Sequence, residues 1–203
     1  MVGGTIAAFW AVSILFVVTP GADWAYAISA GMQQRTVPAV SGMLTGHLGA
    51  TVIVAAGVGA LVTGIPGALT ILTIAGSLYL TWLGVTTLAR PGIVHAEQGA
   101  AGSPLRWWLK GFGVSGLNPK VFLLFLAVLP QFTDTTADWP LVAQIVALGL
   151  VHIASCAVVY LLVGYGADGL LRSRPIAARI VSRVSGIAMI AIGAFLVVER
   201  LIL

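Results

Sequence analysis

Charged residues are scarce in this chain: they make up 8% of its 203 residues, whereas apolar residues make up 59%. Soluble domains carry about 25% charged residues, so this scarcity excludes an ordinary soluble domain. The mean hydropathy of +1.06 indicates an integral membrane protein instead. The formal charge of +4 does not indicate a nucleic-acid partner, because the cations fall in short stretches between apolar runs and form no continuous basic face.

Cysteine and acidic residues are also rare. The single cysteine, Cys156, excludes an intramolecular disulfide framework and a paired-thiol relay. No group of His, Cys and carboxylate residues shows metal-ligand spacing, and no nucleophile stands in a strand-to-helix elbow. Six acidic residues in the whole chain leave few candidates for hydrolytic chemistry. The sequence therefore predicts no enzyme, no bound metal and no other cofactor.

Long apolar runs are what the chain has in abundance. A membrane-spanning helix needs about 20 apolar residues, and six segments meet this length, so we expect an all-α membrane domain of six transmembrane helices. A polar linker at 93–105 separates two halves of three helices each, 1–92 and 106–203. The first segment has no preceding Lys or Arg, so we expect an uncleaved helix rather than a secretory signal. The six segments are 5–31, 38–63, 66–89, 107–132, 141–166 and 179–202.

The distribution of Lys and Arg predicts the orientation of the chain in the membrane. Eight of its ten Lys and Arg residues lie in or beside the connections after the first, third and fifth segments, and none follows the second or fourth. Because cytoplasmic loops carry the excess of cations, we expect both termini on the outer side of a bacterial inner membrane. Each half has an odd number of crossings, so the two halves would form inverted repeats.

Two of the six segments contain a proline-bearing interruption with an ionisable residue beside it. The first reads Thr19-Pro20-Gly21-Ala22-Asp23, and the second reads Leu117-Asn118-Pro119-Lys120. A helix broken at membrane depth is tolerated where its freed backbone groups face protein or a water-filled cavity. Matching interruptions in two halves point to the binding site of a transporter. We expect Thr19 and Asn118 to cap the restarted helices, each followed by its proline.

Asp23 and Lys120 are the pair predicted to bind substrate. A carboxylate is favoured in the first turn of a helix and a cation is disfavoured there, so a buried Lys120 needs an anion. We expect the two side chains to approach each other in the empty site, and a zwitterion to insert between them. Exchange of Asp23 between a proton and the substrate would couple export to proton entry. In the alternative interpretation, the prolines only kink packed helices and the charges snorkel to an interface.

Three further polar residues are weaker candidates. His47 and His152 lie in the helix that follows the interruption in each half. Each is a proton carrier, a substrate contact or simply a hydrogen-bonded structural residue. Gln131, at the outer end of the fourth segment, either lines an exit path or caps a loop.

Glycine patterns are explained by helix packing. Gly42 and Gly46 form a small-residue ridge that brings helices close together, with a homodimer contact as the alternative. The stretch 111–116 matches the dinucleotide fingerprint G-x-G-x-x-G. That motif needs a preceding strand, whereas here it opens an apolar helix. We therefore interpret these glycines as a site of flexibility and close packing ahead of the second interruption.

Taken together, these motifs resemble the LysE/RhtB family of bacterial amino-acid exporters over essentially the whole chain. The resemblance implies a six-helix exporter of amino acids or close derivatives, driven by ion gradients, in which Asp23 fits the expected pattern. The family often has a second proline where this chain has Ala22, which implies a softer first break. The matching stretches are Thr19–Asp23, Gly42, Gly46, Gly49, Gly76–Gly84, Gly111-Phe112, Leu117–Lys120 and Leu129–Phe132.

The sequence thus predicts a secondary transporter that exports amino acids resembling homoserine, threonine, leucine or lysine by proton antiport and alternating access. Its partners would be the substrate, the proton and the lipid bilayer. An exporter of divalent metal ions or another small solute is the alternative, but a metal carrier needs a surplus of buried carboxylates, whereas Asp23 and Lys120 sum to zero charge. A membrane-embedded enzyme would need paired cysteines or a metal cluster. A lipid scramblase would act on lipid without amino-acid counterflow.

Overall fold

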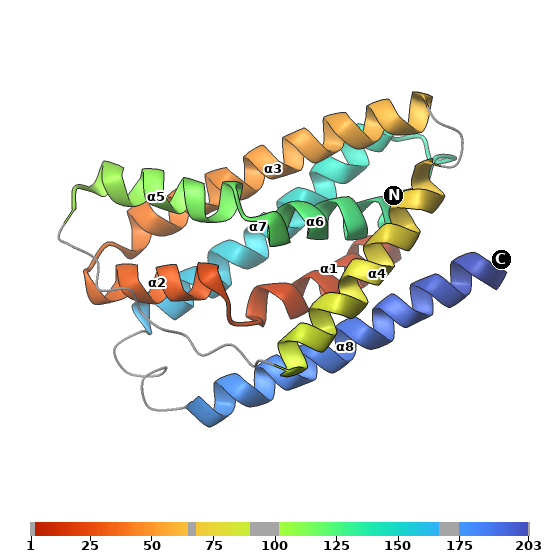
Figure 1. Ribbon diagram of the computed structural model, residues 1–203. Coiled ribbons are helices and arrows are strands. Elements are labelled where there is room, and N and C mark those ends of the chain that lie inside the picture. The colour runs from red at the N-terminus through yellow and green to blue at the C-terminus, as the bar shows by residue number, and fades with distance from the viewer. Residues whose placement is uncertain (1–2, 65–67, 90–101, 167–174, 203) are drawn as a thin grey trace.

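Helices make up all the regular secondary structure in the part of the chain that the structure describes, a computed structural model covering residues 3–64, 68–89, 102–166 and 175–202 (Figure 1). This confirms the all-α class for those residues. Four predicted segments are single helices, and the first and fourth are interrupted where expected. The single helices are α3 (Thr36–Gly64), α4 (Ala68–Ala89), α7 (Leu141–Tyr165) and α8 (Pro175–Ile202). The interrupted ones are α1 (Gly3–Val18) with α2 (Ala22–Met32), and α5 (Pro104–Gly116) with α6 (Pro119–Val128) and the 3-10 turn η1 (Leu129–Phe132).

The helices run back and forth between two ends of the molecule. The start of α1, the start of α7 and the end of α8 lie at one end, and the turn between α2 and α3 lies at the other (Figure 1). Within the described residues, Thr36–Val58 and Leu141–Tyr165 are each long and apolar enough to cross a membrane. The pair α1 and α2, bent by 60° at its break, forms a third span if it is counted as one. Six crossings and the division into two halves stay predictions, and 93–101 of the predicted linker lie outside the described residues.

The apolar core forms two clusters near opposite ends of α3 and α7. On α3, His47 lies between the residues that belong to one cluster and those that belong to the other. His152 has the same place on α7. A polar layer therefore separates two apolar ones, at the level of the helix breaks. The contributions are 50–58 and 39–43 from α3, and 145–148 and 156–163 from α7.

Close packing of α3 on α5 accounts for both glycine patterns. A Cβ atom on Gly42 would collide with the Trp108 carbonyl, and one on Gly46 would lie 2.6 Å from the Gly116 backbone nitrogen. Gly111 is pressed in the same way against a backbone carbonyl of α3. Small residues let helix backbones approach closely in membranes. The glycines of α3 and the G-x-G-x-x-G match in α5 thus form the two sides of one helix contact within the chain. A homodimer stays a prediction.

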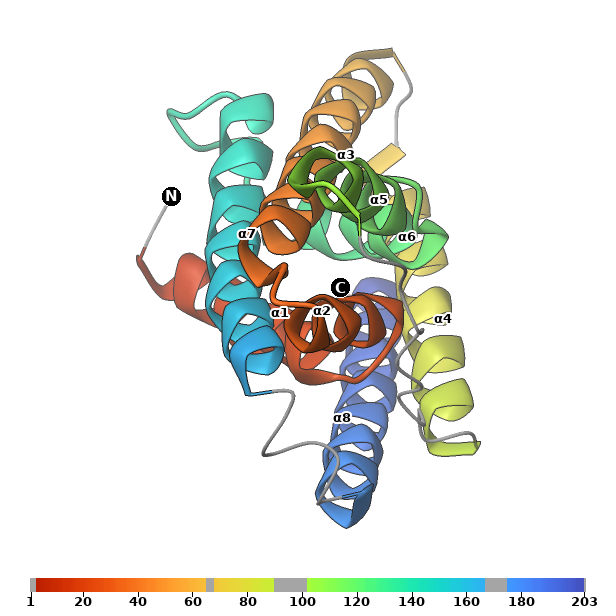
Figure 2. The ribbon, with the colours of Figure 1, turned by 90° about the vertical axis from the view of Figure 1, so that its left-hand side faces the viewer.

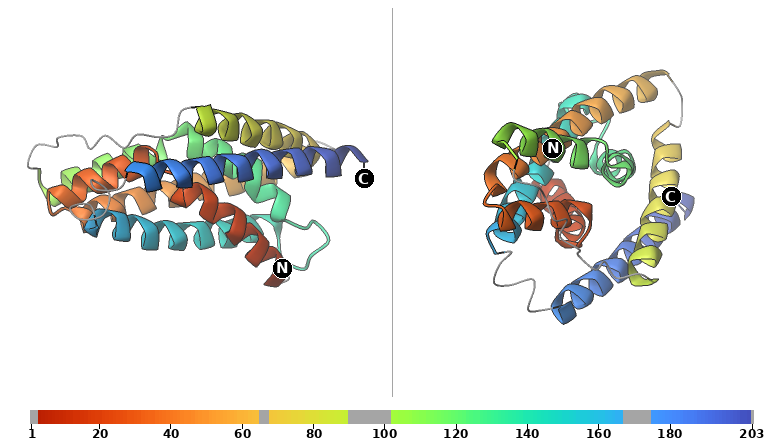
Figure 3. Two further views of the ribbon diagram at one scale, coloured as in Figure 1. Left: turned by 90° about the horizontal axis from the view of Figure 1, so that it is seen from below. Right: turned by 60° about the vertical axis from the view of Figure 1, so that its left-hand side comes forward.

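The long helices α4 and α8 pack along each other on one side of the molecule (Figure 3). They cross at Gly84 and Gly186, where a Cβ on either glycine would lie within 3 Å of the other's carbonyl oxygen, at 2.6 and 2.9 Å. The view along the helices shows α2, α3, α5 and α7 gathered on the other side (Figure 2). The candidate site is lined by residues of α1, α2, α3, α6 and α7 and lies away from the contact of α4 with α8.

Gln144 is fully buried near the start of α7. Its side chain forms hydrogen bonds with the connection between η1 and α7. Its Nε2 donates to the carbonyls of Asp134 and Trp139, both at 2.8 Å, and its Oε1 accepts from the Asp134 N–H at 2.9 Å. The Asp134 carboxylate in turn accepts from the Thr136 hydroxyl and N–H, and these bonds hold the pKa of the Asp134 carboxyl below its usual value. Nothing in the sequence marks Gln144, because its role depends on how the loop folds back.

Replacing Gln144 with leucine removes all three of these hydrogen bonds. Buried groups that lose their partners cost about 1–3 kcal/mol each, so Gln144→Leu should lower thermal stability in detergent and make the connection at 133–140 a site of proteolytic cleavage. The matched control is Gln33→Leu, at an exposed position after α2. Equal cleavage of the two variants would contradict this role.

Candidate functional site

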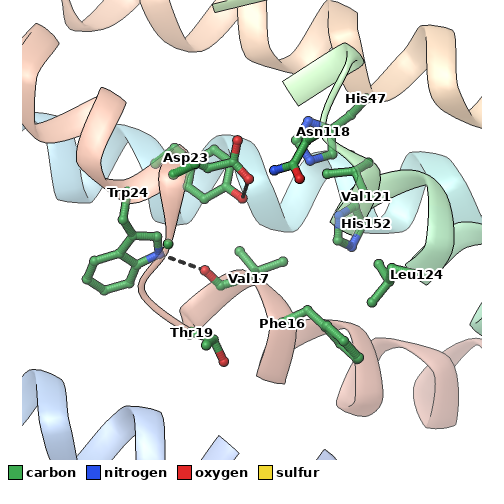
Figure 4. A pocket seen from close by; sticks show the side chains of 13 residues that line it. Phe16, Val17, Thr19, Asp23, Trp24, His47, Asn118, Val121, Leu124 and His152 are labelled. Atoms are coloured by element: carbon green, nitrogen blue, oxygen red, sulfur yellow. Dashed lines mark hydrogen bonds between the residues drawn. The ribbon is translucent and has the colours of Figure 1, made fainter. Parts of the chain in front are cut away.

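A small cavity lies between the two helix breaks and is bordered by the middle of α3 and α7 (Figure 4). Its volume of about 30 Å³ leaves room for one or two water molecules. Residues from both halves of the chain line it, although they are far apart in the sequence. Six predicted site residues are among them: Thr19, Gly21, Asp23, His47, Asn118 and His152. The others are Phe16, Val17, Ala22, Trp24, Val121, Leu124 and Tyr160.

The first break differs in detail from the prediction. Helix α2 begins at Ala22, and its N-cap residue is Gly21, in an extended conformation with no side-chain cap bond. The expectation that Thr19 caps this helix and Pro20 opens it is therefore wrong. The Thr19 hydroxyl instead donates to the Leu15 carbonyl in the last turn of α1, at 2.5 Å.

The break brings two side chains to the start of α2. Asp23 lies in the first turn, as predicted, where a carboxylate is stabilised by the helix dipole. The indole N–H of Trp24 donates to the Val17 carbonyl at 2.8 Å and so ties α2 to the end of α1. This bond joins the two arms of the 60° bend.

The position of the second break follows the prediction, and capping by the Asn118 side chain stays a prediction. Helix α6 begins at Pro119, directly after Asn118, whose carbonyl accepts from the Val121 N–H at 3.0 Å. Asn118 lines the cavity. The side chains of Pro119 and Lys120 lie outside the described residues, so the pairing of Asp23 with Lys120 stays a prediction.

The Asp23 carboxylate joins three helices. One oxygen accepts from the hydroxyl of Ser115 on α5 at 2.7 Å, and the other accepts from the hydroxyl of Tyr160 on α7 at 3.3 Å. The acid of the first half is thus held by two elements of the second half. Sequence reasoning missed both partners. Ser115 lies within the G-x-G-x-x-G match just ahead of the second break, which was a usable signal, whereas nothing in the sequence indicates that Tyr160 faces Asp23.

The two buried histidines face each other, with ring centroids 5.4 Å apart and exposed fractions of 1% and 2% for His47 and His152. The Nδ1 of His47 bonds to the Met43 carbonyl at 2.9 Å, and the Nδ1 of His152 bonds to the Ser13 hydroxyl at 2.7 Å. The Nε2 of His152 lies 3.3 Å from the thiol of Cys156, one turn further along α7. These bonds give both rings a structural role, and their parts in proton transfer or substrate binding stay predictions.

Two other predicted residues lie away from the cavity wall. Gln131 is in η1, beyond the end of α6, and Pro20 is buried in the break itself, between the lining residues Thr19 and Gly21. Neither is among the residues that line the cavity.

Apolar helices packed around a buried polar layer define an integral membrane protein. More specifically, the chain belongs to the family of LysE type translocators, whose family model matches residues 14–200. The resemblance inferred from the motifs is therefore confirmed.

Individual relatives share 25% to 30% of their aligned residues with this chain. The chain is 30% identical to an "Uncharacterized membrane protein" of Vibrio cholerae serotype O1 over 157 residues, which is 75% of each chain. It is 25% identical over 130 residues to proteins of Salmonella typhimurium and Salmonella choleraesuis named "Cysteine/O-acetylserine efflux protein". That alignment spans 63% of this chain and 65% of the exporters, just under two thirds of their length. No solved structure matches the chain.

Proposed function

We propose that this protein exports a small amino acid or a close derivative across the bacterial inner membrane by proton antiport. The observation that carries the proposal is the half-buried Asp23 carboxylate, which lies at a helix break on the wall of a cavity between apolar helices. The translocator family supports a transported small molecule. The candidate substrates are homoserine, threonine, leucine and lysine, and the efflux proteins named above add cysteine and O-acetylserine.

Opposite walls of the cavity have opposite electrostatic character. Asp23 supplies an anion on one wall, and on the other Asn118 leads into the start of α6, where the helix dipole places a partial positive charge. A zwitterion fits this polarity, with its ammonium toward Asp23 and its carboxylate toward the start of α6 and Lys120. Because a substrate ammonium or a proton would compete for the same carboxylate, the two would bind in alternation, which is the basis of antiport.

The present cavity is too small for such a substrate. Pockets that hold small molecules measure about 300 Å³ or more, about ten times the volume seen here. Binding therefore requires the walls to separate, and the Ser115 and Tyr160 hydroxyls must release Asp23 as they do so. We infer that this structure corresponds to a closed, substrate-free state in an alternating-access cycle.

Four of the helix contacts support two related halves, while the contact of α4 with α6 has no comparable counterpart between α8 and α2 among the described residues. Helix α5 packs on α3 and α1 packs on α7, while α2 packs on α7 and α6 packs on α3. The equivalent helices of the two halves are α1 and α5, α2 and α6, and α3 and α7. Exchanging them converts the contact of α5 with α3 into that of α1 with α7, and the contact of α2 with α7 into that of α6 with α3. His47 with His152, and Gly84 with Gly186, are contacts between equivalent helices. Such an arrangement is expected for halves related by an axis in the membrane plane, which rock against each other during transport.

Counterflow of labelled amino acids in proteoliposomes tests the proposal. The wild-type protein should exchange small neutral amino acids, and an imposed proton gradient should drive their accumulation against a concentration gradient. Lys120→Met should lose both activities if Lys120 binds the substrate carboxylate. Full activity in Lys120→Met would rule out the zwitterion clamp, and lipid scrambling without counterflow would favour a scramblase over an exporter.

A further inference from the structure

We propose that His47, His152 and Cys156 form a binding site for one thiophilic divalent cation, such as Zn²⁺, at the contact between the two halves. Their ligand atoms all lie within 4.8 Å of one another, and all three side chains are buried. His47 comes from α3, while His152 and Cys156 come from consecutive turns of α7. No spacing in the sequence indicates this cluster, because only the packing of α3 on α7 assembles it.

The ring of His47 is oriented as a metal ligand would be. The Met43 carbonyl can only accept a hydrogen bond, so Nδ1 of the neutral imidazole carries the proton and Nε2 keeps its lone pair. Among the described residues, none forms a hydrogen bond with this Nε2. The His47 ring lines the cavity beside a second imidazole and a thiol. The geometry of the three ligand atoms therefore suits a cation.

The other two ligand atoms already lie at a suitable separation. Zn–N and Zn–S bonds of about 2.0 and 2.3 Å at a tetrahedral angle place nitrogen and sulfur about 3.5 Å apart. The Nε2 of His152 and the Sγ of Cys156 are 3.3 Å apart. Ser13 holds the far nitrogen of His152 as Met43 holds that of His47. Outer partners of this kind are typical of histidines that bind metals, because they fix the ring orientation.

Ligand chemistry favours a borderline or soft cation. Thiolate and imidazole prefer Zn²⁺ or Cd²⁺, whereas Mg²⁺ and Ca²⁺ prefer oxygen. Binding would displace the thiol proton of Cys156 and leave one excess positive charge on the cluster. The Asp23 carboxylate offsets this charge from nearby, since it accepts from the hydroxyl of Tyr160, one turn beyond Cys156 on α7.

A cation held by α3 and α7 would tether the two halves. This consequence rests on the proposed function, because it assumes that the halves rock during export. Alternation would then stop with the cavity closed, so Zn²⁺ would act as an inhibitor of transport and not as its cargo.

Absorption spectroscopy of the purified protein tests the site directly. Cys156 is the only cysteine, so a cadmium–thiolate charge-transfer band reports this thiol and no other. Titration with Cd²⁺ should show one ion per chain, which Zn²⁺ displaces and Mg²⁺ does not. Cys156→Ser should abolish the band, and Ser13→Ala should weaken binding by about 10- to 100-fold. His47→Gln removes a ligand and should weaken binding by at least as much. The control is His95→Gln, which changes the remaining histidine of the chain, in the polar linker, and should leave binding unchanged.

Several outcomes would overturn the proposal. The site is excluded if no band appears, or if His47→Gln and His152→Gln leave it unchanged while size-exclusion profiles show that both variants are folded. In proteoliposomes Zn²⁺ should slow counterflow by the wild-type protein more than counterflow by Cys156→Ser. Each rate is compared with the rate of the same protein without zinc. Zinc that binds without slowing exchange, or that is carried across the membrane, contradicts the tether. Because the Cd²⁺ titration needs no transport, failure of the export proposal would leave its result unaffected.

Discussion

Asparagine in place of Asp23 should reduce amino-acid counterflow by roughly 30-fold or more, which corresponds to a loss of at least about 2 kcal/mol of binding free energy. Asparagine keeps the size of the side chain and can still bond to Ser115 and Tyr160, which hold Asp23 in this structure. It cannot pair with a substrate ammonium or release a proton. The loss should therefore appear in transport and not in folding.

A stability measurement and a control variant separate the loss of the Asp23 charge from a loss of folded structure. Thermal stability of Asp23→Asn in detergent should match that of the wild-type protein within about 1 kcal/mol, because one hydroxyl can still donate to the amide oxygen and the other can accept from the amide N–H. Asp138→Asn, which neutralises an exposed acid in the connection before α7, is the matched control for net charge and should transport normally. Wild-type counterflow in Asp23→Asn would exclude Asp23 as the substrate carboxylate partner.

A leucine at Gly42 should prevent correct assembly of the helices, whereas a leucine at Gly57 on the same helix should be tolerated. A Cβ at position 42 would collide with the backbone carbonyl of Trp108, and a backbone cannot rotate aside as a side chain can. Overpacking a close contact costs about 1–3 kcal/mol even where side chains yield, so we expect at least the upper end of that range. At Gly57 no atom lies within 4 Å of the added Cβ.

The readouts for the glycine pair are expression level, size-exclusion profile and thermal unfolding in detergent. Gly57→Leu controls for the loss of glycine and for added apolar surface, since Gly57 is exposed and lies in the apolar stretch 52–58 of α3. If both variants fold equally well, α3 does not need its close approach to α5, and the packing interpretation of the glycine ridge is wrong.

Local sequence was enough to locate the helices and their interruptions. Apolar length and turn-forming residues set the bounds of α3, α4 and α7, and proline placed both breaks, because proline cannot continue a helix hydrogen-bond ladder. The same local logic failed for Thr19. Its hydroxyl has two acceptable partners along the chain, and which one it uses depends on the path of the chain through Pro20 and Gly21.

Contacts between distant helices were beyond local reasoning. Asp23, His47 and His152 stood out because a polar residue in an apolar run is conspicuous by itself. Ser115, Tyr160 and Cys156 did not, since hydroxyl and thiol groups are common in membrane helices and can bond within their own helix. Gln144 was missed because its partners depend on how the connection before α7 folds back.

By itself, the order of apolar runs, prolines and isolated polar residues determined a membrane-embedded helical protein of the translocator family with a broken helix in each half. Those properties follow from chain-local physics: burial of apolar surface, the missing proline N–H and the cost of a charge in lipid. Only the tertiary structure decided which side chains meet, namely Asp23 with Ser115 and Tyr160, and His47 with His152 and Cys156. The reason is that partner choice depends on the rotation and depth at which helices from opposite halves pack.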